Sequence, residues 1–224
     1  MPDDTTAAPH GPVVEVDIVS DVMCPWCVIG FRQLEQALEV TGAGARIRWH
    51  PFELNPDMGP EGQNLSDHIS QKYGASAEQS AKNRAHIETL GQSHGIVFAF
   101  GPESRIVNSF GAHQLLEFAL AQGVQHPLKL ALFQAYFTRG RDVSDIATLL
   151  DIAQSVGLDP AAAERVLDSG TLAANVREKQ KFWTDRGISG VPSMVFDGKY
   201  LLTGAQGAEN YANLLRKVVS EQAA

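Results

Sequence analysis

Two cysteines, Cys24 and Cys27, have the side chains and spacing best suited to chemistry in this chain. They are the only cysteines among 224 residues and enclose Pro25 and Trp26. An apolar run over residues 13–20 precedes them, and apolar residues at helical spacing follow, so we expect the pair where a strand ends and a helix begins. A thiol at a helix N-terminus faces unpaired N–H groups and the positive end of the helix dipole, which both favour a thiolate. The pair is therefore predicted to be a redox-active dithiol.

The order of the two cysteines predicts their roles. Cys24 opens the helix and is expected to be the more exposed nucleophile, while Cys27, one turn further on, would attack the mixed disulfide and release the substrate. Pro25 suits the first turn of a helix and would fix the helix start. A structural disulfide and half of a zinc site are the alternatives. Zinc prefers four ligands, and no second Cys-x-x-Cys or His-x-x-x-His accompanies the pair, so no metal site is predicted.

Composition limits the classes of function. The chain is 44% hydrophobic and 20% charged, with a net charge of −8, which argues against nucleic-acid or anionic-membrane partners. No apolar run approaches the roughly 18 residues of a membrane span. The first residues lack the basic and apolar segments of a signal peptide, so residues 1–12 are predicted to be a disordered leader and the protein to be cytoplasmic. In that compartment a lone Cys-x-x-Cys is more often catalytic or metal-binding than structural.

The positions of the strand and helix patterns predict an α/β fold. A strand over 13–20, a helix over 25–39 and a strand over 46–50 form a β-α-β unit, with the two strands expected to be parallel. Helical patterns then fill more than a hundred residues. Two strands, 191–196 and 200–203, joined by an Asp-Gly turn, and a helix over 208–219 end the chain. Neither end forms a complete layer alone, so we expect both to share one sheet.

This order, with Cys-Pro-Trp-Cys after a strand and Val-Pro opening a later one, resembles the thioredoxin superfamily, and the long helical insert resembles its DsbA-like branch. The resemblance implies a thioredoxin-like domain, residues 13–62 and 187–224, with an all-helical domain, residues 63–186, inserted between its two halves. Several stretches resemble the bacterial, largely cytoplasmic FrnE-type group, a relative of 2-hydroxychromene-2-carboxylate isomerases and kappa-class glutathione transferases. They are SDVMCPWCVIG (20–30), PFELNP (51–56), SRIVNS (104–109), GVPS (190–193) and YLLTGAQ (200–206).

The resemblance also implies site residues. Thioredoxin-like proteins place a cis-proline against the Cys-x-x-Cys, here Pro192, which leaves the N–H and C=O of Val191 to pair with an extended substrate. Asn108 is expected to face the site from the insert, and Phe52 to line a glutathione-like cleft. Trp26 is either a contact surface for substrate or packed on the helix, and Pro25 beside it is also a candidate substrate-binding residue.

Two further predictions concern groups beside the cysteines. Thioredoxins carry a buried carboxylate that accepts a proton from the second cysteine. By position Asp17 is the candidate for this carboxylate, and a solvated residue at the strand end is the alternative. His113 on the expected helix after Asn108 has either a structural or a substrate role.

Differences from the relatives favour thiol–disulfide exchange. The isomerases and transferases carry a serine where this chain has Cys24. The periplasmic DsbA oxidants have a histidine where this chain has Trp26, so we expect a less stabilised thiolate and a more reducing couple. The predicted enzyme is a protein-disulfide oxidoreductase acting on protein or small-molecule disulfides, with glutathione as a possible cosubstrate and no other cofactor. A glutathione-dependent isomerase or transferase and a redox-sensitive, chaperone-like binding module remain alternatives. The kappa-class resemblance makes a homodimer a further expectation.

Overall fold

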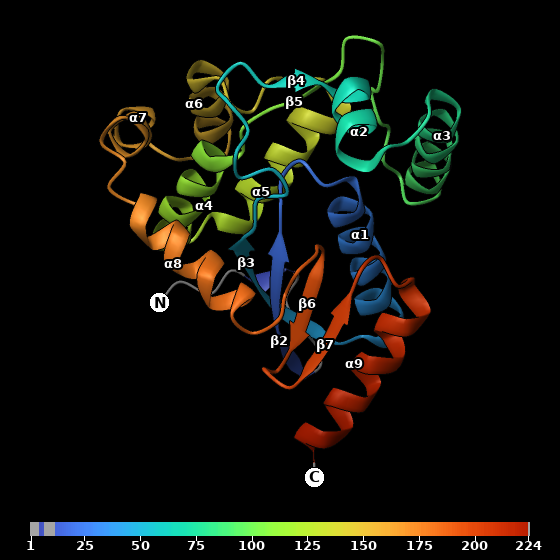
Figure 1. The fold of residues 1–224 in the computed structure, drawn as a ribbon. Helices are drawn as coiled ribbons and strands as arrows, with labels where there is room; N and C mark the ends of the chain where they lie inside the picture. Colours follow the sequence, from blue (N-terminus) through green and yellow to red (C-terminus); the bar gives the residue numbers. More distant parts are fainter. Residues whose placement is uncertain (1–4, 7–11, 224) are drawn as a thin grey trace.

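The computed structural model describes residues 5–6 and 12–223, and its centre is a five-stranded sheet in the order β1-β3-β2-β6-β7 (Figure 1). Strands β2 and β3 are parallel, and the other neighbours are antiparallel. The two distant ends of the chain thus share one sheet, as predicted. The strands are β1 (Thr5–Thr6), β2 (Val13–Ser20), β3 (Gly44–Pro51), β6 (Ser193–Phe196) and β7 (Tyr200–Thr203).

The segment between the two halves of the sheet is helical apart from a short ladder of β4 (Gln63–Asn64) with β5 (Arg105–Ile106), which the sequence did not indicate. The fold class is therefore confirmed, with this small departure from an all-helical insert. The helices are α1 (Pro25–Thr41), α2 (Leu65–Tyr73), α3 (Ala77–Ser93), α4 (Phe110–Gln122), α5 (Gln125–Phe133), the π-helical turn η1 (Gln134–Thr138), α6 (Ile146–Ser155), α7 (Pro160–Ser169), α8 (Ala173–Thr184) and α9 (Ala208–Gln222).

The N-terminal segment differs from the predicted disordered leader in one place. Thr5–Thr6 form β1 and pair with Ala45 and Arg46 of β3. Residues 1–4 and 7–11 of the predicted leader lie outside the described residues. Among the helices of the described ranges, none is long and apolar enough to cross a membrane.

The sequence around helix α1 places the cysteine pair at the first turn of the helix. Cys24 is the N-cap residue and Pro25 occupies the first turn, where a missing N–H costs no hydrogen bond. Buried side chains such as Phe31 and Leu34 recur at helical spacing and face the sheet. The helix ends at Gly42, whose φ of 68° is left-handed and suits glycine. Because β2 runs directly into this helix, the two cysteines sit at the carboxyl end of a central strand.

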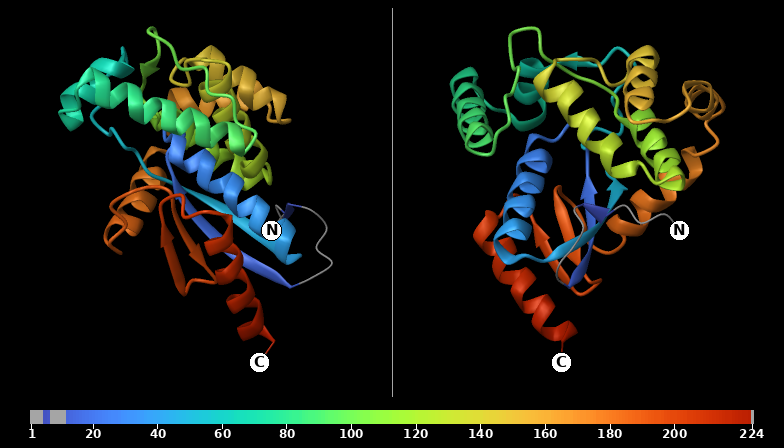
Figure 2. Two further views of the ribbon diagram at one scale, coloured as in Figure 1. Left: turned by 90° about the vertical axis from the view of Figure 1, so that its right-hand side faces the viewer. Right: turned by 180° about the vertical axis from the view of Figure 1, so that it is seen from behind.

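The helices cover the sheet unevenly. Helix α1 packs against α9 along one side of the sheet, while α5 and α8 contact β3 (Figures 1 and 2). Helices α2 and α3 lie beyond the carboxyl end of β2, next to the start of α1 (Figure 1). Helix α2 has no buried residue, and Gly91 is the one buried residue of α3. These two helices are therefore anchored weakly, through partly buried side chains, above the cysteine pair.

Candidate active site

The two cysteines are free thiols that differ in their access to solvent. The backbone N–H of Cys24 donates to the carbonyl of Asp21 at 3.3 Å, and that of Cys27 donates to the carbonyl of Cys24 at 3.0 Å. Cys24 is 3% exposed and Cys27 is 0% exposed. Only Cys24 of the pair lines the neighbouring cavity described below. A substrate entering from the cavity can therefore reach Cys24, with Cys27 behind it.

Val191 and Pro192 face the pair from the other half of the fold. The Val191–Pro192 peptide bond is cis, as the resemblance implied. The Cys24 thiol donates to the carbonyl of Val191, with 3.6 Å between Sγ and oxygen. In the dithiol state that carbonyl accepts the Cys24 thiol, and its pairing with a substrate stays a prediction. A Cβ at Gly30 would lie 3.1 Å from Cγ of Pro192, so glycine permits α1 to approach the proline this closely.

The two thiols titrate as a unit. A hydrogen bond with Cys27, burial and the charges of Cys27 and Asp21 raise the pKa of Cys24 well above its ordinary value. Burial also raises the pKa of Cys27, but neighbouring groups lower it by more than burial raises it. The Cys24 thiol, the cation of Lys129 and the Ser20 hydroxyl lower the pKa of Cys27 below its ordinary value. In the reduced pair the negative charge therefore favours the buried sulfur, although the helix start alone would favour Cys24.

The buried carboxylate beside the pair is Asp21, which is 1% exposed. It accepts hydrogen bonds from the backbone N–H of Met23 at 3.2 Å and of Leu54 at 2.7 Å. Burial favours its neutral form, but hydrogen bonding to His113, the charge of His113 and the two N–H donors together lower the pKa of Asp21. Asp21 thus connects the strand end to the loop after β3 and holds the start of the cysteine segment.

Asp17, the candidate proton acceptor from the sequence, lies elsewhere. Its carboxylate is 2.7 Å from Nε2 of His50, and its side chain is 27% exposed. His113 is fully buried, and its Nε2 donates to the carbonyl of Phe52 at 3.0 Å. The same nitrogen is 3.6 Å from the Asp21 carboxylate. His113 therefore supports the site from behind and does not reach the cavity.

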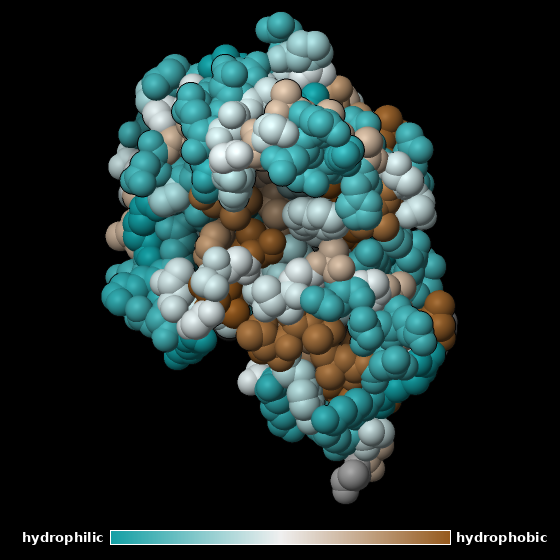
Figure 3. Space-filling model, turned by 45° about the vertical axis from the view of Figure 1, so that its right-hand side comes forward, coloured by the Kyte–Doolittle hydropathy of each residue, from teal (hydrophilic) through white to brown (hydrophobic). Residues whose placement is uncertain are grey.

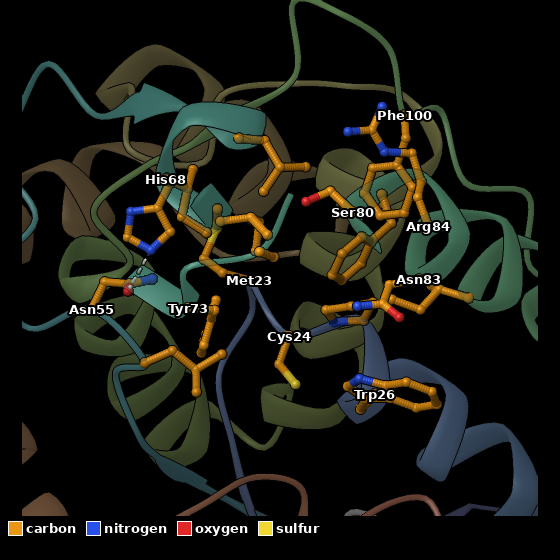
Figure 4. Close-up of a pocket in the computed structure, with 18 of the residues that line it drawn as sticks. Met23, Cys24, Trp26, Asn55, His68, Tyr73, Ser80, Asn83, Arg84 and Phe100 are labelled. Atoms are coloured by element: carbon orange, nitrogen blue, oxygen red, sulfur yellow. Dashed lines mark hydrogen bonds between the residues drawn. The ribbon is translucent and has the colours of Figure 1, made fainter. Parts of the chain in front are cut away.

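A cavity of about 500 Å³ opens over Cys24 (Figure 4). Pro25, Trp26 and Val191, all predicted to bind substrate, line it. In the close-up, the Cys24 side chain lies between Tyr73 and Trp26, with the sulfur between them. The face that carries α2 and α3 shows apolar surface recessed in a hollow below a polar rim (Figure 3). The cavity is thus mainly apolar, which suits a small-molecule site.

The upper wall of the cavity comes from α2 and α3, which sequence reasoning did not connect with the site. Tyr73, at the end of α2, is exposed. Arg84 donates to the hydroxyl of Ser66 at 3.0 Å and links the two helices. Cavity residues from these helices are Leu65, His68, Ile69, Tyr73, Ser80, Asn83, Arg84, His86 and Ile87. Partly exposed apolar side chains on otherwise polar helices were the one signal that could have indicated them.

Two residues predicted to bind substrate do not line the cavity. Asn108 donates to the carbonyl of Met58 at 2.7 Å and accepts from the N–H of Phe110 at 2.8 Å. It fixes the loop after β3 to the start of α4, which begins at Phe110 and not at Asn108. The Phe52 side chain packs with the satellite cluster around Trp183. Both residues are therefore structural supports in this conformation.

No group of three or more His, Cys, Asp or Glu side chains suited to a metal ion occurs in the part of the chain that the structure describes. The cavity over Cys24 carries polar side chains that could hold a small polar ligand. Arg84, His68 and Asn55 are among them, and His68 Nε2 lies 2.9 Å from Oδ1 of Asn55 (Figure 4).

Comparisons with known proteins agree with this geometry. The family model described as a DSBA-like thioredoxin domain matches residues 15–216. YwbO of Bacillus subtilis (strain 168), described as an uncharacterized protein, is 25% identical over 210 residues, which cover 93% of this chain and 97% of YwbO.

Two solved structures show the same architecture. The probable DsbA oxidoreductase SCO1869 from Streptomyces coelicolor has a TM-score of 0.87 and 28% identity, covering 93% of this chain and 91% of its own. The cytosolic disulfide reductase DsbM from Pseudomonas aeruginosa, solved with GSH, has a TM-score of 0.63 and 17% identity, covering 92% of this chain and 99% of its own. At that identity the second similarity concerns the fold alone.

Proposed function

Since this chain belongs to the DsbA-like thioredoxin domain family, we propose that it is a thiol–disulfide oxidoreductase whose redox-active couple is Cys24 and Cys27. The observation that carries this proposal is the arrangement of the two sulfurs. Cys24 lines the cavity, while Cys27 is fully buried one helical turn behind it and shares a hydrogen bond with Cys24. An accessible sulfur backed by a second one is what attack and resolution require.

The reaction proceeds in two exchanges. A proton moves from Cys24 to the Cys27 thiolate, and the Cys24 thiolate attacks one sulfur of the substrate disulfide. The substrate S–S bond breaks, the leaving thiolate takes up a proton from solvent, and a mixed disulfide forms. Cys27 then attacks Cys24 Sγ, and its proton passes to the second substrate sulfur, which leaves as a thiol while a Cys24–Cys27 disulfide forms. The substrate gains two electrons, and a thiol reductant such as glutathione or a dithiol protein returns the enzyme to its starting state.

The cavity favours low-molecular-weight disulfides over folded proteins. Cys24 is 3% exposed, and α2 and α3 stand over it. A space of about 500 Å³ matches small-molecule sites, which enclose most of the ligand surface. We expect a disulfide in a folded protein to approach the sulfur less readily than a small disulfide, because α2 and α3 stand over it. We place the reaction in the cytoplasm, the compartment in which disulfide reduction is sustained.

The size of the cavity gives a first test. We expect the protein, with dithiothreitol as reductant, to turn over oxidised glutathione at least about tenfold faster per molecule than insulin, because only the small disulfide fits under α2 and α3. Tyr73→Ala removes a side chain beside Cys24 and should narrow that ratio by increasing insulin turnover. Tyr73→Phe keeps the ring and serves as control. Equal rates for both substrates in the wild type would contradict the preference for small disulfides.

A glutathione-dependent isomerase or transferase is the second candidate, favoured by a cavity of about 500 Å³, which is large enough for glutathione. In that case Cys24 would activate glutathione without forming a disulfide with Cys27. The Cys24→Ser variant separates the two functions. It should lose disulfide reduction under the first proposal and retain isomerase or transferase activity under the second, since serine can orient the bound thiol.

A further inference from the structure

A lysine lies buried behind the cysteine pair. Lys129 of α5 is 1% exposed, and its ammonium nitrogen is 5.3 Å from the ring centroid of Trp49 and 4.7 Å from that of Phe133. Within the described ranges, no carboxylate forms an ion pair with it. A buried ammonium without a counter-charge is costly, and lysine is rarely buried unless it is paired. A negative charge near Lys129 would therefore stabilise the buried ammonium.

The cysteine pair provides that charge. Phe31 lies one helical turn after Cys27 on the buried face of α1, and its ring centroid is 5.2 Å from that of Trp49. The resolving sulfur is therefore one turn away from a side chain that packs on the Trp49 ring, which Lys129 also contacts. Burial lowers the pKa of Lys129 to about 8. Negative charge on Cys27 raises that pKa, and it does so more strongly than the charge of Asp21. The Asp21 carboxylate already accepts two backbone N–H groups and lies beside His113. Cys27 is therefore the acid whose charge depends most on the lysine.

We propose that Lys129 is a positioning residue for the resolving step, whose ammonium is the buried counter-charge of the Cys27 thiolate. This role rests on the proposed function, because it gives the buried sulfur the charge it needs to attack the mixed disulfide at Cys24. When the Cys24–Cys27 disulfide forms, the Cys27 thiolate is consumed, and the ammonium loses its counter-charge. Lys129 thus stabilises the dithiol form relative to the disulfide and makes the couple more oxidising.

Neighbouring elements bring other titratable groups toward Lys129 or toward the ring that it contacts. Asp21 from the end of β2 and Cys24 from the start of α1 also carry or acquire negative charge that favours the ammonium. His126, one turn earlier on α5, stacks on the same Trp49 ring. On β3, His50 pairs with Asp17, away from the lysine. Because the pKa of Lys129 is near 8, its effect on Cys27 should be full at neutral pH and fade as the pH rises past that value.

Lys129→Met tests this role, since methionine keeps most of the volume of the side chain and removes the charge. We expect the equilibrium constant with the glutathione couple to shift about tenfold toward the Cys24–Cys27 disulfide, which corresponds to about 30 mV. The ultraviolet thiolate absorbance should move to higher pH. Lys217→Met is the matched control, because Lys217 also lies over an aromatic ring, 4.4 Å from the Tyr200 centroid, but is exposed on the outer face of α9. An unchanged potential and thiolate titration in folded Lys129→Met would overturn the proposal.

A second measurement separates the lysine from the other groups that act on Cys27. In Cys24→Ser, Cys27 is the one remaining thiol, and its thiolate absorbance reports its titration. Adding Lys129→Met to this variant should move the titration to higher pH, and an unmoved titration would contradict a stabilising ammonium. If the titration moves while the wild type exchanges no disulfide with glutathione, the ammonium–thiolate pair stands, and the oxidoreductase proposal fails together with the resolving role.

Discussion

Cys24→Ser is expected to reduce disulfide turnover to the uncatalysed level, and Cys27→Ser is expected to stop the reaction one step later. Cys24 is the one sulfur of the pair that lines the cavity, and Cys27 at 0% exposure cannot replace it. Without Cys27, the first attack still occurs but the mixed disulfide on Cys24 cannot be resolved. Turnover of oxidised glutathione with dithiothreitol measures the first effect, and mass spectrometry of the intact protein measures the second as a covalent adduct.

Serine is a close match for cysteine in size, so both variants should fold, and circular dichroism provides that control. The adduct should accumulate on Cys27→Ser and be absent from Cys24→Ser. An adduct on Cys24→Ser would show that Cys27 is reached directly and would contradict the assigned order of attack. Full turnover by Cys24→Ser would exclude the couple as the catalytic group.

Asp21→Ala is expected to lower the free energy of unfolding by roughly 3 kcal/mol, since it leaves one buried and one partly buried backbone N–H donor unpaired, at about 1–3 kcal/mol each. The donors are those of Met23 and Leu54, so the segment that leads into the cysteines would lose its fixed position. Urea unfolding of the reduced protein measures the loss. Asp17→Ala is the control, because that carboxylate is partly exposed and pairs with His50, and we expect a loss below about 1 kcal/mol.

The Asp21 carboxylate also makes the stability of the fold depend on pH in the acid range. The fold lowers the pKa of Asp21 below its ordinary value of 3.8. The charged Asp21 therefore contributes fully to the free energy of unfolding when the pH is above the ordinary pKa. This contribution is lost as the pH falls through the lowered pKa of the folded state. Wild-type stability should fall more steeply in this acid range than that of Asp21→Asn. Parallel curves for the two proteins would contradict a charged Asp21 in the fold.

Much of the fold could be predicted because it depends on local patterns. The apolar run before Cys24, the helical spacing after it and the Asp-Gly turn at residues 197–198 each specify an element without distant contacts. Family resemblance added the cis bond at Pro192 and the DsbA-like membership, and both are confirmed.

The missing parts of the site depend on packing between distant segments. Asp17 and Asp21 look alike in the sequence, and only the loop after β3 shows which one is enclosed. Lys129 sits in an apolar helix, where its charge would be expected to reach solvent. Asn108 and Phe52 were expected at the cavity but turn away from it. Helices α2 and α3 carry too few buried residues to indicate what they cover.

The redox potential of the Cys24–Cys27 couple, measured in glutathione buffers, tests the central claim most directly. Trp26 replaces the histidine that stabilises the thiolate in the periplasmic oxidants. We therefore expect a reversible two-electron couple between about −180 and −270 mV, the range of protein disulfide isomerase, glutaredoxins and thioredoxin. A value near −120 mV, that of a periplasmic oxidant, would contradict the predicted reducing character, and the absence of any exchange would contradict the oxidoreductase function itself.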